Sequence, residues 1–414
     1  MNILFLCNGT FITPFSGYQT RVLSGIEKLQ KRISEEDGRC ILFTNEALVR
    51  VFLKRKRRKE IKEYREKQEI FLYVNYLLSS KYLLTSLFNR WLVSRKLINI
   101  CQREKVDIIH IHNAFYPFIN DKIKEKLKVK VVFDCHGLAT EEAVMSGYCG
   151  RDSLKFKRME KMEKVCIENA DHLVCVSRAL GDYIQKNIST NVKITYVPCC
   201  TDIGKFRYNR VTRDKLRREL KLQDKFVVLY AGSFLPWHGK EEIIEVFSHI
   251  KQFVPHAHLL VLTSNVYKRE ILRELIRKNT NSKNYTLRSI PHDDVPNYLM
   301  IGDVGLLLRK RSLVNQVAFP TKFAEYLACG LPVLASGAIH DIRDIVKTHC
   351  QGAVINEIED GGSIKRGISS LLSLYSKEGQ ARIAERCVAF AKKYLSWEFG
   401  VEQYKSVYNS LYDD

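Results

Sequence analysis

Short uninterrupted runs of apolar residues alternate along this chain with longer segments in which apolar residues recur at helical spacing. Asn2–Cys7 is such a run, and the apolar residues of the following Tyr18–Ile33 fall on one helical face. A buried run followed by an amphipathic segment is typical of a strand–helix unit in a parallel sheet. Because the alternation returns in both halves, it predicts an α/β protein with two Rossmann-like domains built on mainly parallel sheets.

The predicted elements divide between the two halves. In the first half the strands are Asn2–Cys7, Arg39–Thr44, Val106–Ile111, Val129–Phe133, His172–Val176 and Val192–Val197, and the helices are Tyr18–Ile33, Leu154–Ala170 and Leu180–Ile188. In the second half the strands are Phe226–Ala231, His258–Thr263, Tyr285–Ile290, Val304–Leu308 and Leu331–Ala335. The helices there are Glu241–Lys251, Val266–Lys278, Val295–Met300, one that opens at Pro320, and a tail, Ala381–Leu411, with a break at Ser396.

The segment Pro198–Phe206, reading PCCTDIGKF, interrupts this alternation between the halves. Such a break favours a connection over a regular element, and 414 residues are typical of two domains. We therefore expect an N-terminal domain at residues 1–200 and a C-terminal domain at residues 201–395. A final helix at residues 396–414 is expected to pack back on the N-terminal domain.

The composition is that of a folded protein, with 45% hydrophobic and 27% charged residues. Twelve cysteines are scattered without a CxxC pair, which argues against zinc and thioredoxin-type sites and favours buried thiols in a reducing cytoplasm. Met1–Cys7 lacks a basic lead-in and is too short for an export signal. No uncharged apolar run is long enough to span a bilayer, so we do not expect an integral membrane protein.

The chain carries a net charge of +21, which implies an anionic partner: nucleic acid, anionic lipid or a phosphorylated substrate. The alternative is a soluble surface that merely repels itself. The sharpest basic run is Lys54–Lys59, and basic residues continue among aromatic and aliphatic ones to residue 97. This composition favours an interfacial segment at residues 54–97 on an anionic membrane. A nuclear-import or nucleic-acid patch and a solvated helix face are the alternatives.

The stretch Pro320–Ser336, reading PTKFAEYLACGLPVLAS, carries the clearest candidate chemistry. Proline suits the first turn of a helix, where backbone N–H groups need partners, and Gly330 ends the helix before a buried strand. A lysine, Lys322, beside such a helix N-terminus makes an anion site suited to phosphate. Glu325, one turn further on, could accept two hydroxyl hydrogens from a ribose. The alternative is a capped helix with surface charges.

Two features of the first half lie where parallel sheets bind ligands. Gly17 ends the loop after the first strand and could let the backbone approach a diphosphate, although a simple turn glycine is an equal alternative. That loop lacks GxGxxG, so a dinucleotide cofactor is not indicated. His136 follows the strand Val129–Phe133 and precedes two glutamates, which makes it a candidate acid–base group or a structural histidine.

Taken together, these residues resemble the family 4 glycosyltransferases of the GT-B architecture. The resemblance covers most of the chain and is strongest at residues 176–336. Its motifs are VS at 176–177, the Pro198–Phe206 junction, GSFLPWHG at 232–239 and PTKFAEYLACGLPV at 320–333. The resemblance implies two Rossmann-like domains whose sheets face a central cleft, with the acceptor on the N-terminal domain and the nucleotide sugar on the C-terminal domain.

The resemblance also implies a donor site. Glu325 would bind the donor ribose, and Thr321 and Lys322 would lie at the diphosphate with Ser233 and His238. Family members often carry Arg and Lys at these last two positions, so Arg309 and Lys310 could substitute for the missing charge. Gly17 matches a glycine near the diphosphate and His136 a histidine near the transferred sugar, so we place His136, Lys322 and Glu325 in the catalytic set.

One departure concerns the family's paired glutamates. Glu325 matches the second, but the first position is Val317, and Asn315 could take over its contact with the donor sugar. No Asp-x-Asp triplet occurs, so a metal-bound diphosphate is not expected, and the protein's own positive groups would replace the metal. We therefore expect no metal site and no cofactor beyond the nucleoside-diphosphate sugar used as substrate.

These observations lead to one expected function. The chain is expected to be a retaining, metal-independent hexosyltransferase acting on a lipid-linked glycan in cell-surface polysaccharide assembly, peripheral on the cytoplasmic face of the cell membrane. An epimerase or a phosphorylase on the same frame is the first alternative. A basic nucleic-acid-binding protein is the second, and the absence of a recognition-module pattern argues against it.

Overall fold

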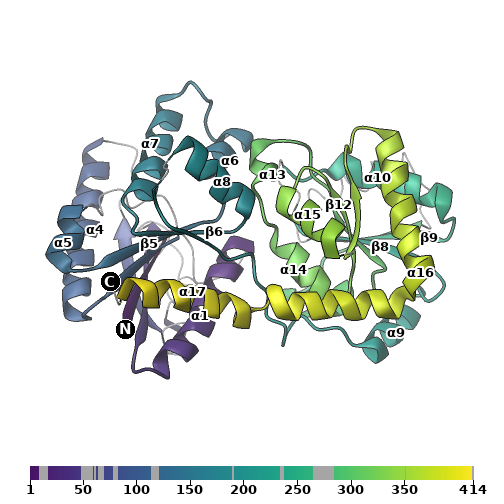
Figure 1. Ribbon diagram of the computed structural model, residues 1–414, viewed down its shortest axis with the longest axis horizontal. Coiled ribbons are helices and arrows are strands. Elements are labelled where there is room, and N and C mark those ends of the chain that lie inside the picture. Colours follow the sequence, from purple (N-terminus) through teal and green to yellow (C-terminus); the bar gives the residue numbers. More distant parts are fainter. Residues whose placement is uncertain are drawn as a thin grey trace. The chain divides into compact units, whose positions relative to one another are not determined.

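The computed structural model describes residues 1–8, 17–47, 59, 62–63, 70–77, 83–112, 121–188, 191–233, 237–263, 284–349 and 351–412. The chain forms two compact units (Figure 1). Unit 1 comprises Met1–Pro198 and Gly400–Asp414, and unit 2 comprises Cys199–Phe399. Each unit is built on one parallel sheet with helices packed around it, which confirms the predicted fold class.

Seven strands form the sheet of unit 1, in the order β3-β2-β1-β4-β5-β6-β7. They are β1 (Asn2–Asn8), β2 (Arg39–Ala47), β3 (Phe71–Leu77), β4 (Ile108–Ile111), β5 (Lys130–Cys135), β6 (His172–Cys175) and β7 (Ile194–Tyr196). The helices are α1 (Gly17–Ser34), α4 (Leu83–Arg103), α5 (Asp121–Leu127), α6 (Ala139–Met145), α7 (Leu154–Glu168) and α8 (Arg178–Asn187). The last helix, α17 (Trp397–Tyr412), runs from the end of unit 2 into unit 1.

Six strands form the sheet of unit 2, in the order β10-β9-β8-β11-β12-β13. They are β8 (Phe226–Ala231), β9 (Ala257–Leu262), β10 (Tyr285–Arg288), β11 (Val304–Leu307), β12 (Val333–Ser336) and β13 (Gly352–Ile355). The helices are α9 (Arg210–Glu219), α10 (Lys240–Phe253), α12 (Val295–Leu299), α13 (Leu313–Gln316), α14 (Thr321–Ala328), α15 (His340–His349) and α16 (Gly361–Tyr394), with a 3-10 turn, η2 (His292–Asp294).

Local sequence accounts for several element boundaries. Ser177 caps α8 by accepting a hydrogen bond from the backbone N–H of Leu180, as its position before an amphipathic run predicts. Asp360 caps α16 in the same way, and α16 breaks at Gly379, which has φ +72°. The central strands β1 and β8 lie at the core of their sheets, so their apolar runs are buried on both faces.

Strand order reverses between β1 and β4 in unit 1 and between β8 and β11 in unit 2. In open parallel sheets the loops at the carboxyl ends of such neighbouring strands diverge and leave room for a ligand. Gly17 and His112 come after the two strands in unit 1, and Gly232 and Arg309 come after the two in unit 2. The topology therefore marks one candidate ligand edge in each unit.

The described part of segment 54–97 is divided between a strand and a helix rather than forming one element. Phe71–Leu77 forms the edge strand β3 in register with β2, and Leu83–Arg103 forms α4. Leu72 and Asn75 of this strand are buried, whereas Phe71 is exposed. The basic residues at 54–58 lie outside the described residues, as do the loop residues 9–16 and the predicted helix Val266–Lys278.

Two further observations bear on the sequence interpretation. No helix among the described residues is long and apolar enough to cross a bilayer. The described cysteines are free thiols, all buried except Cys149, which is half-buried.

Candidate functional site

Helix α14 begins at the carboxyl edge of the unit 2 sheet. Pro320 occupies its N-cap in an extended conformation, and no side chain caps the first turn. Phe323 and Tyr326 bury one face of the helix, and Gly330, with φ +70°, follows its C-terminus in the left-handed conformation that favours glycine. Because the first amides of a helix have no intrahelical acceptor, this end of α14 is suited to a negatively charged ligand.

The Lys322 side chain lies directly against the end of β8. Its ammonium donates a hydrogen bond to the Tyr230 hydroxyl at 3.2 Å and stands 4.3 Å from the centre of that ring. A Cβ on Gly232 would meet Cε and Nζ of Lys322, so a side chain at position 232 would displace the lysine from this position. The Tyr326 hydroxyl accepts the backbone N–H of Ala231 at 2.9 Å and ties α14 to the same strand end.

Lys322 and Glu325 are both half-buried, and their environment shifts the pKa of each group toward neutral pH. Burial lowers the pKa of Lys322 to about 7, helped by the positive charge of Arg309 and opposed by Glu325. Burial raises the pKa of Glu325 to about 7, opposed by the positive charges of Lys322 and Lys205. An anionic ligand would favour the charged lysine, and hydroxyl donors would favour the ionised glutamate.

The loop after β8 places His238 beside Ser233. His238 Nδ1 is close to the Ser233 carbonyl oxygen and lies 3.3 Å from the Tyr230 hydroxyl. Because a carbonyl oxygen only accepts hydrogen bonds, Nδ1 carries the proton. The Tyr230 hydroxyl also donates to the Ser233 carbonyl at 3.1 Å, so one tyrosine connects this loop to Lys322.

Arg309 follows β11, and both its backbone and its side chain form hydrogen bonds. Its backbone N–H donates to Ser336 Oγ at 3.0 Å, and its guanidinium donates to Asn315 Oδ1 at 3.1 Å. The amide of Asn315 donates in turn to the carbonyl oxygens of Trp237 and Lys310 at 3.3 and 2.8 Å. Asn315 is fully buried and engages both ends of its amide within the protein. Its position indicates a structural tie between loops rather than a contact with a sugar.

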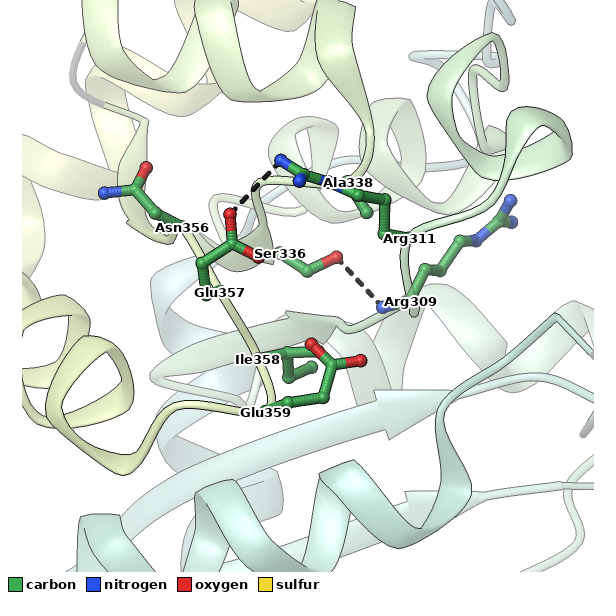
Figure 2. A pocket seen from close by; sticks show the side chains of 8 residues that line it. All are labelled: Arg309, Arg311, Ser336, Ala338, Asn356, Glu357, Ile358 and Glu359. Carbon is green, nitrogen blue, oxygen red and sulfur yellow. Dashed lines mark hydrogen bonds and ion pairs between the residues drawn. The ribbon is translucent and has the colours of Figure 1, made fainter.

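A pocket adjoins this edge at the carboxyl ends of β11, β12 and β13 (Figure 2). Its lining residues are Arg309, Arg311, Ser336, Ala338, Asn356, Glu357, Ile358 and Glu359. Two of these lining residues, Arg311 and Glu357, form an ion pair at 3.1 Å. The Arg309 guanidinium points away from the other lining side chains, toward the loop that carries Asn315.

The structure brings most of the predicted donor-site residues together in unit 2. Ser233 and His238 follow β8, Arg309 follows β11, and Thr321, Lys322 and Glu325 occupy the first two turns of α14. The remaining two predicted site residues belong to unit 1, where Gly17 opens α1 and His136 follows β5.

His136 belongs to a buried polar group in unit 1 that we call the histidine cluster. Its members are Arg21, His110, His112, Asp134, His136, Tyr404 and Tyr408. Asp134 is fully buried, and its pKa lies well below its usual range because the surrounding histidines and Arg21 outweigh the effect of burial. Burial lowers the pKa of His136 to about 3. A pKa this low favours the neutral form of the His136 ring near pH 7.

Three potential metal-ligating atoms in this cluster, from His110, His112 and Asp134, lie within 4.8 Å of one another. The Arg21 guanidinium, 3.9 Å from Asp134, already supplies the positive charge that balances the carboxylate.

Comparison with known families decides the class of the protein. Residues 49–205 match the family described as Glycosyltransferase Family 4, and residues 212–392 match Glycosyl transferases group 1. The chain belongs to glycosyltransferase family 4. This glycosyltransferase is 22% identical over 325 residues to the N-acetyl-alpha-D-glucosaminyl L-malate synthase of Bacillus anthracis, which covers 78% of this chain and 79% of that protein.

Solved structures share the fold of this glycosyltransferase. The crystal structure of Anabaena HepE in complex with UDP superposes with a TM-score of 0.71 at 14% identity and covers 99% of this chain and 100% of that one. WaaG, a glycosyltransferase involved in lipopolysaccharide biosynthesis, superposes with a TM-score of 0.66 at 14% identity, covering 97% and 99% of the two chains. The two-sheet α/β architecture of this glycosyltransferase is therefore GT-B.

Sequence reasoning missed several residues of both edges. Tyr230 lies inside a buried strand run and gave no separate signal, although its hydroxyl contacts Lys322. Arg21 and Tyr404 lie on helices far apart in the sequence, and only the fold brings them to Asp134. The stretch Asp134–Gly137, which begins within β5, pointed to His136 but not to the buried role of Asp134.

Proposed function

We propose that this glycosyltransferase moves a hexose-type sugar from a nucleoside diphosphate to an acceptor hydroxyl and retains the anomeric configuration. The observation that carries the proposal is the position of Lys322, which lies at the uncapped N-terminus of α14 and against Gly232, the glycine that follows β8. A helix N-terminus and a lysine at a strand-order reversal suit a diphosphate. The UDP bound to HepE, a protein of the same fold, supports a nucleotide donor.

Each residue of this edge has a proposed task. The diphosphate is held by the first amides of α14 at Thr321 and Lys322 and by the Lys322 ammonium. Ser233 and His238 form the facing loop, and Arg309 adds a second positive charge. Glu325 accepts hydrogen bonds from the ribose hydroxyls. The family resemblance assigns Gly17 to the diphosphate and His136 to the transferred sugar.

The proposed reaction breaks the bond between the sugar's anomeric carbon and the diphosphate oxygen, and the electron pair goes to the leaving diphosphate. The acceptor oxygen forms the new bond on the same face, and its proton passes to the departing phosphate. Positive groups stabilise the charge that grows on the diphosphate, and removing one such group typically costs about 2.7–4 kcal/mol of activation free energy. In this proposal Lys322, Arg309 and the helix amides take the place of a metal ion.

The proposed acceptor is a lipid-linked glycan, reached from a peripheral position on the inner face of the cell membrane. Net charge +21 supports an anionic surface as partner. Helix α4 adds exposed aromatic rings, because Phe88 and Trp91 are 48% and 52% exposed and Arg95 stands 5.0 Å from the Trp91 ring. Exposed aromatic rings beside an arginine are typical of a membrane-facing surface.

Lys322→Ala and Glu325→Ala test the donor site. Each should lower kcat by about 10²–10³ and weaken nucleoside-diphosphate binding in calorimetry while the thermal midpoint stays near wild type. Lys251→Ala is the matched control, because it removes the same charge from the end of α10 at the opposite edge of the sheet. Full transfer activity in Lys322→Ala or Glu325→Ala would overturn the site assignment.

The reaction class and the membrane partner need separate assays. Consumption of a nucleotide sugar without an acceptor would identify an epimerase, and a requirement for inorganic phosphate would identify a phosphorylase. NMR of the product tests retention directly. Co-sedimentation should show binding to vesicles with anionic lipid that is lost in Trp91→Ser, and equal binding to neutral vesicles would contradict the membrane proposal.

A further inference from the structure

The histidine cluster of unit 1 has a defined direction of hydrogen bonding. Arg21 Nη1 lies 2.9 Å from Nδ1 of His136. A guanidinium only donates, so Nδ1 must accept and the ring proton must be on Nε2. That Nε2 lies 3.0 Å from Nδ1 of His112 and 3.7 Å from Asp134 Oδ1. Both nitrogens of His136 are therefore engaged, and a single neutral tautomer satisfies them.

Helix α17 completes this arrangement from the other end of the chain. The Tyr404 hydroxyl donates to Asp134 Oδ2 at 2.5 Å and accepts from Arg21 Nη2 at 3.4 Å. Arg21 Nη2 also donates to the carbonyl oxygen of Val197 at 3.1 Å. One turn later, the Tyr408 hydroxyl lies 2.5 Å from Nδ1 of His110, whose Nε2 is 3.6 Å from Asp134 Oδ2.

Tyr404 therefore holds the two groups that determine the state of His136. It fixes the carboxylate of Asp134, and it contacts the guanidinium that faces Nδ1. Tyr404 is itself fixed, because it is 3% exposed and its helix lies alongside α1 in unit 1 (Figure 1). Loss of its hydroxyl would leave a buried carboxylate without its shortest hydrogen bond.

We propose that Tyr404, Asp134 and Arg21 are positioning residues that hold His136 in one orientation, with its proton on Nε2. The C-terminal helix is thus part of the machinery of the unit 1 ligand edge, although it lies about 270 residues away in sequence from Asp134. The proposal rests on the assignment of His136 to the transferred sugar in the proposed function. It predicts that the cluster sets the rate of transfer without affecting nucleotide binding in unit 2.

The Tyr404→Phe variant tests this, since it removes one hydroxyl and keeps the ring. Glu36→Gln is the matched control, because Glu36 pairs with Lys405 on the same helix and has no contact in the cluster. Both variants should show similar thermal midpoints. Tyr404→Phe should lower kcat by about tenfold or more, with the dissociation constant for nucleoside diphosphate unchanged, and Glu36→Gln should change neither.

A second readout does not depend on activity. In protein labelled with ¹⁵N-histidine, long-range ¹H–¹⁵N spectra distinguish the tautomers, and the His136→Gln variant identifies the His136 signals. Wild type should show the Nε2–H form of His136, and Tyr404→Phe should show a mixture or a displaced signal. This result stands even if the donor site in unit 2 is misassigned, so the two proposals fail separately.

Three outcomes would overturn the proposal. The first is a wild-type His136 that is protonated on Nδ1 at neutral pH. The second is a Tyr404→Phe variant that transfers sugar as fast as Glu36→Gln. The third is a stoichiometric Zn²⁺ titration that moves the His110 and His112 signals of EDTA-treated protein, since the cluster would then be a metal site.

Discussion

The ammonium of Lys322 occupies the space that a Cβ on Gly232 would fill, with only 2.4 Å between the two positions. A side chain at position 232 would therefore push the Lys322 ammonium away from the end of β8. Gly232 also has φ +134°, a conformation that other residues rarely adopt. This single relationship places a lysine over a peptide backbone at the point where the strand order of unit 2 reverses.

Gly232→Ala should displace Lys322 and weaken nucleoside-diphosphate binding by roughly tenfold or more, since both the contact and the backbone conformation oppose a methyl group. Calorimetric titration measures the effect. Gly361→Ala is the control in the same unit, because its nearest neighbouring atom would be 3.8 Å from the new methyl. Unchanged affinity in Gly232→Ala would mean that Lys322 does not bind the diphosphate.

Donor affinity should depend on pH with a maximum near pH 7. The pKa of Lys322 is lowered to about 7, so above that pH the free protein must take up a proton before its ammonium can bind a diphosphate, and affinity falls. The pKa of Glu325 is raised to about 7, so below that pH the carboxyl is protonated and accepts ribose hydroxyls poorly. On the acid limb and the alkaline limb of this profile, donor affinity should fall by at most about tenfold per pH unit.

Two variants separate these limbs. Lys322→Arg keeps its charge at all relevant pH values and should flatten the alkaline limb. Glu325→Gln cannot ionise and should flatten the acid limb, leaving only the titration of the nucleotide's own phosphate. A profile that is flat in wild type between pH 6 and 8 would contradict the proposed roles of both residues.

Removal of divalent cations should leave the rate of transfer within about twofold of the untreated enzyme. Two cationic side chains and the N-terminus of α14 lie at the proposed donor edge. In the proposed reaction they supply the positive charge that a metal would otherwise provide. Activity before and after EDTA treatment, with Mg²⁺ added back as the control, measures this. A loss of activity that Mg²⁺ restores would contradict the charge argument.

The sequence predicted the helix and strand at this edge of unit 2 well, because their boundaries depend on local features. Pro320 and Gly330 mark the ends of α14, and the run before Gly232 coincides with β8. The strand β3 was missed because Phe71–Leu77 lies beside basic residues, and its pairing with β2 depends on a long-range register. The histidine cluster could not be predicted, since Tyr404 reaches Asp134 only through the fold.

Asn315 illustrates a second limit of prediction from sequence. Its nearness to Val317 suggested a substitute for a sugar-binding glutamate, but contacts with Arg309, Lys310 and Trp237 engage its amide. Sequence identifies which polar residues lie near a site. It does not reveal which of them have their hydrogen-bonding capacity taken up by the protein.

The final prediction concerns the stability of unit 2, where Asp303 joins α9 to the sheet. Its carboxylate accepts hydrogen bonds from Arg213 and, at 2.9 Å, from Arg217, and it accepts the backbone N–H of Val227 at 2.6 Å. All three charged side chains are buried. Asp303→Asn would leave two buried guanidinium groups without a counter-charge and should cost about 3–5 kcal/mol of unfolding free energy. Chemical denaturation followed by a probe in unit 2 measures the loss.

Asp293→Asn provides the comparison for that measurement. Asp293 forms an ion pair with Lys205 at 2.7 Å, but its side chain is 91% exposed, so water already screens the interaction. The same chemical change should therefore leave the denaturation midpoint nearly unaltered. If the two variants were equally stable, the buried Asp303 pair would contribute no more than a surface ion pair, and the sheet of unit 2 would not depend on it.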